Sequence, residues 1–472
     1  MPRLLALILA SVLAATLLVS RPVQARDMPD PVVVVLERSG PHDWTATFEL
    51  PEPAHSLSFV RSGDNNRVGF WTSTSAGVML VREGETDSLR SHEPRRVFSV
   101  RLDDRLIPRG ADYTPFVRIS ETATAVYLYQ FQVIPGSGDE AVDHSASEPP
   151  PHRFGFSTAR SKPVLFAGRS ISPGEMRTMN GGVGAYAVFG ATEQPRTGTG
   201  FVSLVSDEIP GDLSERLVST IPALLDILAE QLGTPLDTRP NLIFARRPGA
   251  ESGLRFRGGA MAGDIVMELE GDGLDDPDFV RNQRSAITVL VAHELVHLWI
   301  GGLVQNGDAE AAWLHEGAAE AFSWDALTRT FGAGPEFRQA EAQSALEACR
   351  DFLSRGGLAS RTANGERRAH YDCGALIMLA LGNDLTPGNP AAGLSRLWTR
   401  LIALTREAPD RHFDTDTFLT VFEQSGGSTD RRLWIHRLMT GDYSDATTIL
   451  VAGLRDAGLT VDVNDGTPSL QL

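Results

Sequence analysis

Between Pro31 and about Ser206, short runs of alternating apolar and polar residues are separated by turn residues. Alternation with a period of two places successive side chains on opposite faces of a strand, so that one face can be buried. The pattern predicts a mostly β domain over residues 26–206, in the form of a sandwich or curved sheet. Strands are expected near 32–36, 44–50, 68–72, 78–82, 97–102, 125–133 and 201–205.

One stretch of this region, residues 135–151, differs from the rest. It carries Gly, Ser, Asp, Glu and three consecutive prolines, with almost no apolar residue to bury. Such a composition is typical of a flexible surface loop, which we expect here.

After Leu213 the spacing of apolar residues becomes helical. The fold class is therefore expected to be α+β, with an N-terminal β-sandwich-like domain followed by a mainly helical domain over residues 207–472. Helices are predicted at 213–232, 278–300, 315–331, 336–353, 368–381 and 392–405, with strands at 241–245 and 264–269.

The beginning of the chain has the pattern of an export signal. Arg3 precedes an apolar run from Leu4 to Val19, and Val23-Gln24-Ala25 is a small-x-small cleavage pattern. We expect a signal peptide over residues 1–25 and an exported protein, periplasmic or secreted. The alternative is a membrane anchor, because the apolar run is only slightly shorter than a span.

Charge and composition narrow the classes of partner. The formal net charge is −17, and loss of Arg3 and Arg21 with the signal makes it −19. Such an acidic chain disfavours nucleic acid and anionic membranes as partners. No stable membrane insertion is expected after signal cleavage.

Two cysteines occur, Cys349 and Cys373, each within a predicted helix. This number excludes a disulfide-dense scaffold. An exported protein can pair two thiols, and the alternative is a pair of buried free thiols.

A candidate metal site lies in the predicted helix 278–300, which contains His293-Glu294-Leu295-Val296-His297. Two histidines four residues apart lie one turn apart on the same face, so both imidazoles can reach one ion. Glu294 lies about 100° around the helix from His293. That position suits a general base acting on the metal's water. For the pentapeptide alone, the alternative is a pair of structural histidines.

Glu316 follows His297 by nineteen residues and belongs to the next predicted helix. Two imidazoles and one carboxylate leave an open position for water, as a catalytic zinc site requires. The same set also suits iron(II), but Glu294 and the helix favour one zinc ion per chain. Glu320, one turn further, is expected to accept the other N–H of a ligand histidine. The alternative is a solvated carboxylate.

These segments resemble the gluzincin peptidases, and among them the membrane alanyl aminopeptidase and leukotriene A4 hydrolase family. The matching residues are His-Glu-Leu-Val-His-Leu-Trp-Ile-Gly-Gly at 293–302 and Trp-Leu-His-Glu-Gly-Ala-Ala at 313–319. The resemblance implies a thermolysin-like fold for residues 207–472. A weaker likeness to the glycyl aminopeptidases covers residues 418–422, 434–441 and 450–459.

Tyr371 begins a segment, Tyr-Asp-Cys-Gly-Ala, that resembles the family's Tyr-x-Lys-Gly-Ala. The resemblance implies that its phenol donates to the oxyanion of the tetrahedral intermediate, a role that suits a neutral donor. The alternative is an ordinary tyrosine at a helix start.

Residues 258–263 are similar to the family's cleft strand, Gly-Ala-Met-Glu-Asn, which implies that Gly259 and Ala260 contact the substrate. Ala262 and Gly263 replace Glu and Asn, and in the family that Glu binds the substrate's amine. Glu268 or Glu270 could replace it, although solvated strand or turn positions are the more ordinary interpretation.

Together these features predict a zinc peptidase, aminopeptidase-like, that cleaves peptides or small proteins through a metal-activated water. The alternatives are a zinc hydrolase acting on a non-peptide bond and a metal-bound binding protein without activity. A coincidental motif in a structural protein is a further alternative.

Overall fold

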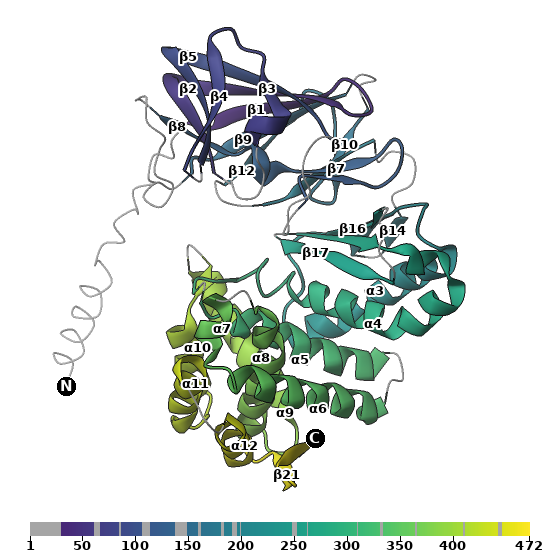
Figure 1. Cartoon of the computed structure of the whole chain (residues 1–472), viewed down its shortest axis with the longest axis vertical. Helices are drawn as coiled ribbons and strands as arrows, with labels where there is room; N and C mark the ends of the chain where they lie inside the picture. The colour runs from purple at the N-terminus through teal and green to yellow at the C-terminus, as the bar shows by residue number, and fades with distance from the viewer. Residues whose placement is uncertain are drawn as a thin grey trace, which may run out of the picture.

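The computed structural model describes residues 30–472 except 61–66, 85, 106–113, 137–148, 159–161, 181–183, 191–195, 199, 248–252, 262, 309, 331–333, 364–365, 409–410 and 442–445. The predicted signal peptide and most of the predicted loop 135–151 lie outside the described residues. Figure 1 shows a β-rich N-terminal part above a mainly helical C-terminal part, which confirms the α+β class. Among the described helices, none has the length and apolarity of a membrane span.

Two sheets form the N-terminal sandwich. The first has the strand order β12-β9-β1-β2-β5-β3, with β4 beside β5 and β8 beside β2. The second has the order β11-β10-β13-β7-β6. The first sheet consists of β1 (Val32–Arg38), β2 (Asp43–Phe59), β3 (Trp71–Ser73), β4 (Val78–Glu83), β5 (Thr86–Asp103), β8 (Val133–Gly136), β9 (His152–Thr158) and β12 (Met176–Met179). The second consists of β6 (Phe116–Arg118), β7 (Thr124–Tyr127), β10 (Val164–Phe166), β11 (Arg169–Ile171) and β13 (Tyr186–Phe189).

Two of the predicted strands are interrupted. The expected strand 125–133 is β7, a 3-10 turn at Leu128–Phe131, and the start of β8. The expected strand 68–72 contains the short helix α2 (Arg67–Phe70) before β3.

The second sheet is buried on both of its faces. Val126 and Phe189 pack in one cluster with the first sheet, whereas Ala125 and Val188 pack in another cluster with the sheet that follows in the chain. Continuous apolar runs are typical of strands covered on two sides, and β7, β10 and β13 are buried at every position. The second sheet therefore connects the two parts of the molecule.

The third sheet has the order β14-β15-β16-β18-β17. It consists of β14 (Arg196–Gly198), β15 (Phe201–Val205), β16 (Asn241–Arg247), β17 (Arg255–Met261) and β18 (Asp264–Glu270). Residues 196–205 thus belong to the sheet of the helical part, although the boundary was predicted at 206. The reason is that β15 pairs in parallel with β16, which requires a crossover, and α3 (Gly211–Gln231) provides it.

Helices cover the other face of the third sheet and build the C-terminal core. They are α3, α4 (Pro277–Val296), α5 (Trp313–Thr330), α6 (Gly334–Leu353), α7 (Leu358–Ala363), α8 (Arg368–Leu385), α9 (Pro390–Glu407), α10 (Thr415–Gln424), α11 (Asp430–Thr440) and α12 (Ala446–Asp456). The bounds of α3, α4, α5, α6, α8 and α9 agree with the predicted ones to within a few residues. A 3-10 turn at Asp272–Asp275, the pair β19 (Gln305–Asn306) and β20 (His412–Phe413), and the hairpin of β21 (Thr460–Asn464) and β22 (Thr467–Gln471) complete the chain.

The helix that carries the histidine motif begins and ends at identifiable residues. The Asp276 side chain accepts the N–H groups of Asp278 and Phe279, and Pro277 occupies the first helical position. The helix ends at Val296, four residues before the predicted end. Gly301 then has a φ of 122°, a conformation that residues with a side chain rarely adopt, so the chain turns away there.

A disulfide between Cys349 and Cys373 joins α6 to α8, with the two Cα atoms 4.9 Å apart. Both residues are fully buried. Of the two alternatives for the cysteines, the paired one is therefore confirmed.

Candidate active site

The described chain brings His293, His297 and Glu316 together, with one ligand atom of each within 4.8 Å of the others. The Nε2 atoms of the two histidines are 3.0 Å apart, and Glu316 Oε2 is 3.2 Å from each. Helix α4 supplies His293, the residue directly after its end supplies the second imidazole, His297, and α5 supplies the carboxylate. Two imidazole nitrogens and one carboxylate oxygen directed at one point fit a zinc ion.

Close contact between α5 and α8 positions the carboxylate. A Cβ atom added to Gly317 would lie 2.2 Å from the carbonyl carbon of Gly374, so the two backbones touch where these glycines cross. Glu316 precedes one glycine, and Tyr371 lies one turn before the other. The crossing therefore fixes the distance between the Glu316 carboxylate and Tyr371.

The charges of this cluster favour an ionised carboxylate. Burial opposes ionisation of Glu316, but the charge of His297 and hydrogen bonds from the surrounding histidines hold its pKa well below the usual range. Burial likewise disfavours a charged His297, and the Glu316 carboxylate nevertheless raises the pKa of His297 to about 9. The cluster thus has a strong demand for positive charge at its centre, which a divalent cation can meet.

The outward nitrogens of the two histidines face different partners. His297 Nδ1 donates to the carbonyl of Ile300 at 3.2 Å. His293 Nδ1 is 3.7 Å from Glu320 Oε1, which is within ion-pair range but longer than a hydrogen bond. The Glu320 side chain is only 8% exposed, so it is not a solvated carboxylate. For Glu320 to accept a hydrogen bond from His293, as predicted, its carboxylate has to move slightly closer to His293 Nδ1.

Tyr371 lies directly against the cluster. Its ring stacks on His293 with centroids 5.3 Å apart and an angle of 16° between the planes. Burial, followed by the charges of Glu316 and Glu294, raises the pKa of its phenol, which also hydrogen-bonds Glu316. The phenol is therefore a neutral donor. Glu294 is partly exposed, and its charge acts on both His297 and Tyr371, which places it at the same centre.

Two residues beside this centre were not predicted from the sequence. His315 Nε2 lies 3.5 Å from the second oxygen of Glu316, and its ring contacts that of His297. Arg368 lies over the Tyr371 ring at 5.3 Å. His315 could have been predicted from its position directly before Glu316. Arg368 could have been predicted from its spacing with Asp372, since the two lie one helical turn apart.

The residues expected to contact substrate lie on β17, the outer strand of the third sheet. Gly258 has a φ of 142°, and a Cβ atom there would lie 1.9 Å from the carbonyl oxygen of Val266. Only glycine fits that position. Gly259 and Ala260 follow it on the edge strand, Gly263 lies in the tight connection to β18, and Ala262 lies outside the described residues.

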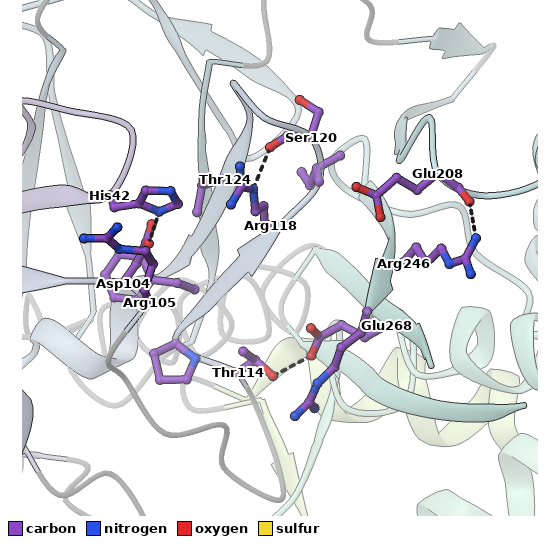
Figure 2. Close-up of a pocket in the computed structure, with 14 residues that line it drawn as sticks. His42, Asp104, Arg105, Thr114, Arg118, Ser120, Thr124, Glu208, Arg246 and Glu268 are labelled. Carbon is purple, nitrogen blue, oxygen red and sulfur yellow. Dashed lines mark hydrogen bonds and ion pairs between the residues drawn. The ribbon is translucent and has the colours of Figure 1, made fainter. Parts of the chain in front are cut away.

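Neither Glu268 nor Glu270 has a free carboxylate to offer a substrate amine. Glu268 is 7% exposed and accepts the hydroxyl of Thr114 at 2.6 Å, in a cavity of about 260 Å³ between β18 and the N-terminal domain. Figure 2 shows it facing Thr114 across this junction. Glu270 pairs with Arg247 and Arg257 at 3.8 and 3.6 Å. The interpretation of both as solvated residues is wrong, because each is engaged within the protein.

Comparisons with known proteins agree with this site. Residues 256–362 match the model of the peptidase family M1 domain. No curated protein matches the chain. An aminopeptidase N family protein from Idiomarina loihiensis is similar in structure, with a TM-score of 0.61, 11% identity, and coverage of 92% of this chain and 79% of the other. Yeast LTA4 hydrolase, solved in complex with bestatin, has a TM-score of 0.50, 12% identity, and coverage of 87% and 68%.

The matched segment contains His293, Glu294, His297 and Glu316, and it ends before Tyr371. The solved structures share the arrangement of a β-rich N-terminal part and a helical part across most of this chain. Residues 256–362 thus match a peptidase family M1 domain, and most of the chain is similar in fold to an aminopeptidase N family protein and to LTA4 hydrolase.

Proposed function

We propose that this protein is an aminopeptidase-like enzyme that hydrolyses peptide bonds with one zinc ion held by His293, His297 and Glu316. The convergence of these three ligand atoms within 4.8 Å, beside the partly buried phenol of Tyr371, is the observation that carries the proposal. Zinc bound there supplies a Lewis acid and lowers the pKa of a water molecule.

The side chains around the ligands transfer the proton, stabilise the oxyanion and orient the imidazoles. Glu294 follows His293 on α4, and its charge acts on His297 and Tyr371; it takes the proton of the attacking water and returns it to the leaving amine. Tyr371 donates its hydroxyl to the oxyanion, and its raised pKa keeps that proton in place. Glu320 and the Ile300 carbonyl orient the two imidazoles.

The substrate is proposed to bind as an extended peptide along β17. β17 is the last strand in the order of the third sheet, and the small residues Gly259 and Ala260 let another backbone approach. The partner is therefore a peptide or small protein in an extended form.

The test is incubation of the zinc-loaded protein with a peptide mixture and identification of the products by mass. Wild type should release fragments, and Glu294→Gln, with the ligand set intact, should release none. Products shortened by one residue at the amino end indicate an aminopeptidase, and internal cuts indicate an endopeptidase. Absence of any product from wild type that retains its zinc would contradict the proposal.

We also propose that the enzyme acts outside the cytoplasm. The disulfide between Cys349 and Cys373 supports this, because such bonds persist in oxidising compartments. Fractionation of cells that express the full chain should place the protein in the periplasm or medium. Recovery of a reduced protein from the cytoplasm alone would contradict it.

A further inference from the structure

Three side chains form a closed ring of contacts with the proposed metal ligand His293. The Arg368 guanidinium lies over the Tyr371 ring at 5.3 Å, and Tyr371 stacks on His293. Glu320 Oε1 is 3.7 Å from His293 Nδ1 and also 3.7 Å from Arg368 Nη1. Arg368 thus contacts both the phenol and the carboxylate that lie against one ligand histidine.

Arg368 is itself held in place by Asp372. Its Nε and Nη2 atoms donate to the two carboxylate oxygens, each at 3.2 Å, and Asp372 is buried. Such a two-point contact fixes the plane of the guanidinium. Because Nε and Nη2 are used in this way, Nη1 is directed at Glu320.

A contribution to overall stability does not explain this arrangement. The Arg368 side chain is 64% exposed, and exposed ion pairs stabilise a fold by only about 0–1 kcal/mol. A contribution by charge alone is the more serious rival, since the charges of Glu320, Asp372 and Arg368 act on Glu341, and those of Arg368 and Glu320 act on Asp372.

We propose that Arg368 is a positioning residue, whose fixed guanidinium holds the Tyr371 ring and the Glu320 carboxylate against His293. It acts through these two side chains and not on the substrate. The inference rests on the proposed function of Tyr371 and Glu320.

The kinetic test compares Arg368→Met, Arg368→Lys and the control Arg367→Met, which removes the same charge from the neighbouring exposed position. Arg368→Met should lower kcat about tenfold with little change in KM. Arg368→Lys should be nearly as slow, because an ammonium lacks the fork that contacts Asp372 and Glu320 together. Arg367→Met should behave as wild type.

A double variant identifies the route of the effect. If Arg368 acts through the phenol, adding Arg368→Met to Tyr371→Phe should lower kcat much less than it does in wild type. Full activity in Arg368→Lys would overturn the proposal, because it would mean that only the charge matters. A raised KM at unchanged kcat in Arg368→Met would do so too, because it would mean that Arg368 binds substrate. Unchanged kinetics in Arg368→Met would also overturn it.

A second measurement needs no substrate and so separates this inference from the proposed function. Release of zinc from the loaded protein to a chelator should be about tenfold faster in Arg368→Met than in wild type or Arg367→Met. Without the Arg368 guanidinium, the Glu320 carboxylate is no longer held against His293. Equal release rates would contradict the link through Glu320. Wild type that keeps its zinc but cleaves nothing would instead contradict the proposed function.

Discussion

Tyr371 makes one contact through its ring and another through its hydroxyl oxygen, so removal of that one atom tests the second contact alone. Its ring stacks on His293, and its hydroxyl reaches Glu316. Substitution by phenylalanine keeps the ring and removes only the donor. The phenol's chemistry can therefore be tested without loss of the packing around the ligands.

Tyr371→Phe should lower kcat by about 10²–10³-fold, the usual effect of removing one oxyanion donor, with little change in KM. Steady-state kinetics on a cleaved peptide, with zinc content measured in parallel, check this. A variant with normal zinc content and normal kcat would exclude Tyr371 as the donor.

At the level of helices, the crossing of α5 and α8 depends on two glycines. A side chain at Gly317 would meet the Gly374 backbone 2.2 Å away, and backbone cannot give way as a flexible side chain can. The same crossing sets the position of Glu316 relative to Tyr371, so the fold and the site share one contact.

Gly317→Ala should lower the free energy of unfolding by about 1–3 kcal/mol, because overpacking outweighs the gain in helix propensity. Zinc affinity should fall with it, as Glu316 moves. Gly211→Ala is the matched control, since an added Cβ there has no neighbour within 4 Å. Urea unfolding and zinc titration of both variants give the comparison, and equal stability of the two would refute the role of the crossing.

The disulfide joins α6 to the helix that carries Tyr371. It closes a loop across a sequence separation of 24 residues, for which chain entropy gives about 3–4 kcal/mol of stabilisation. The double variant Cys349→Ala/Cys373→Ala should therefore unfold at a lower urea concentration than oxidised wild type. Addition of a reductant should have no effect on the variant. A variant as stable as wild type would show that the bond is dispensable.

The sequence predicted most of the longer helices and the shared face of His293 and His297, because both follow from local spacing. Two histidines four residues apart share one face of a helix, and the longer helices after Leu213 have apolar residues at helical spacing. Contacts that depend on the three-dimensional arrangement of side chains could not be predicted from local spacing, so the contact of Arg368 with the Tyr371 ring was missed. The sheet to which β15 belongs was missed too, since an apolar run does not specify its neighbour.

For the whole molecule, the junction between the two parts is a packed and hydrogen-bonded layer. The Tyr186 N–H donates to Asp264 at 2.7 Å, and the Asn241 amide donates to the other oxygen of Asp264, also at 2.7 Å. Val117, Tyr186 and Val266 belong to one apolar cluster across this layer. The N-terminal sandwich and the catalytic part should therefore unfold together.

Asp264 makes that junction sensitive to pH. Burial raises its pKa to about 7 against an ordinary value of 3.8, although hydrogen bonds from Tyr186 and Asn241 oppose the shift. The unfolded chain releases this proton first, so stability from Asp264 is full below about pH 4 and is lost as pH rises to 7. The loss should be about 4 kcal/mol.

The measurement is urea unfolding of wild type and Asp264→Asn between pH 4 and 7. The variant should be less stable at acidic pH, because its amide nitrogen replaces one of the two accepting oxygens and faces a donor, but it should lack the pH-dependent loss. The difference between the two proteins should shrink as pH rises. A difference that is constant over this range would show that Asp264 is ionised throughout.

The second sheet, covered on both sides, has a consequence for tolerance of substitution. In β5, Phe98, Val100 and Leu102 alternate with exposed or partly exposed residues, so every second position can accept a polar side chain. In β10, β13 and the last three residues of β7 no position can, because each of these side chains enters one of two cores. A library of single substitutions should therefore show these positions as continuous blocks that tolerate no polar residue. Polar substitutions there should also abolish peptide cleavage, although none of these strands carries a proposed metal ligand.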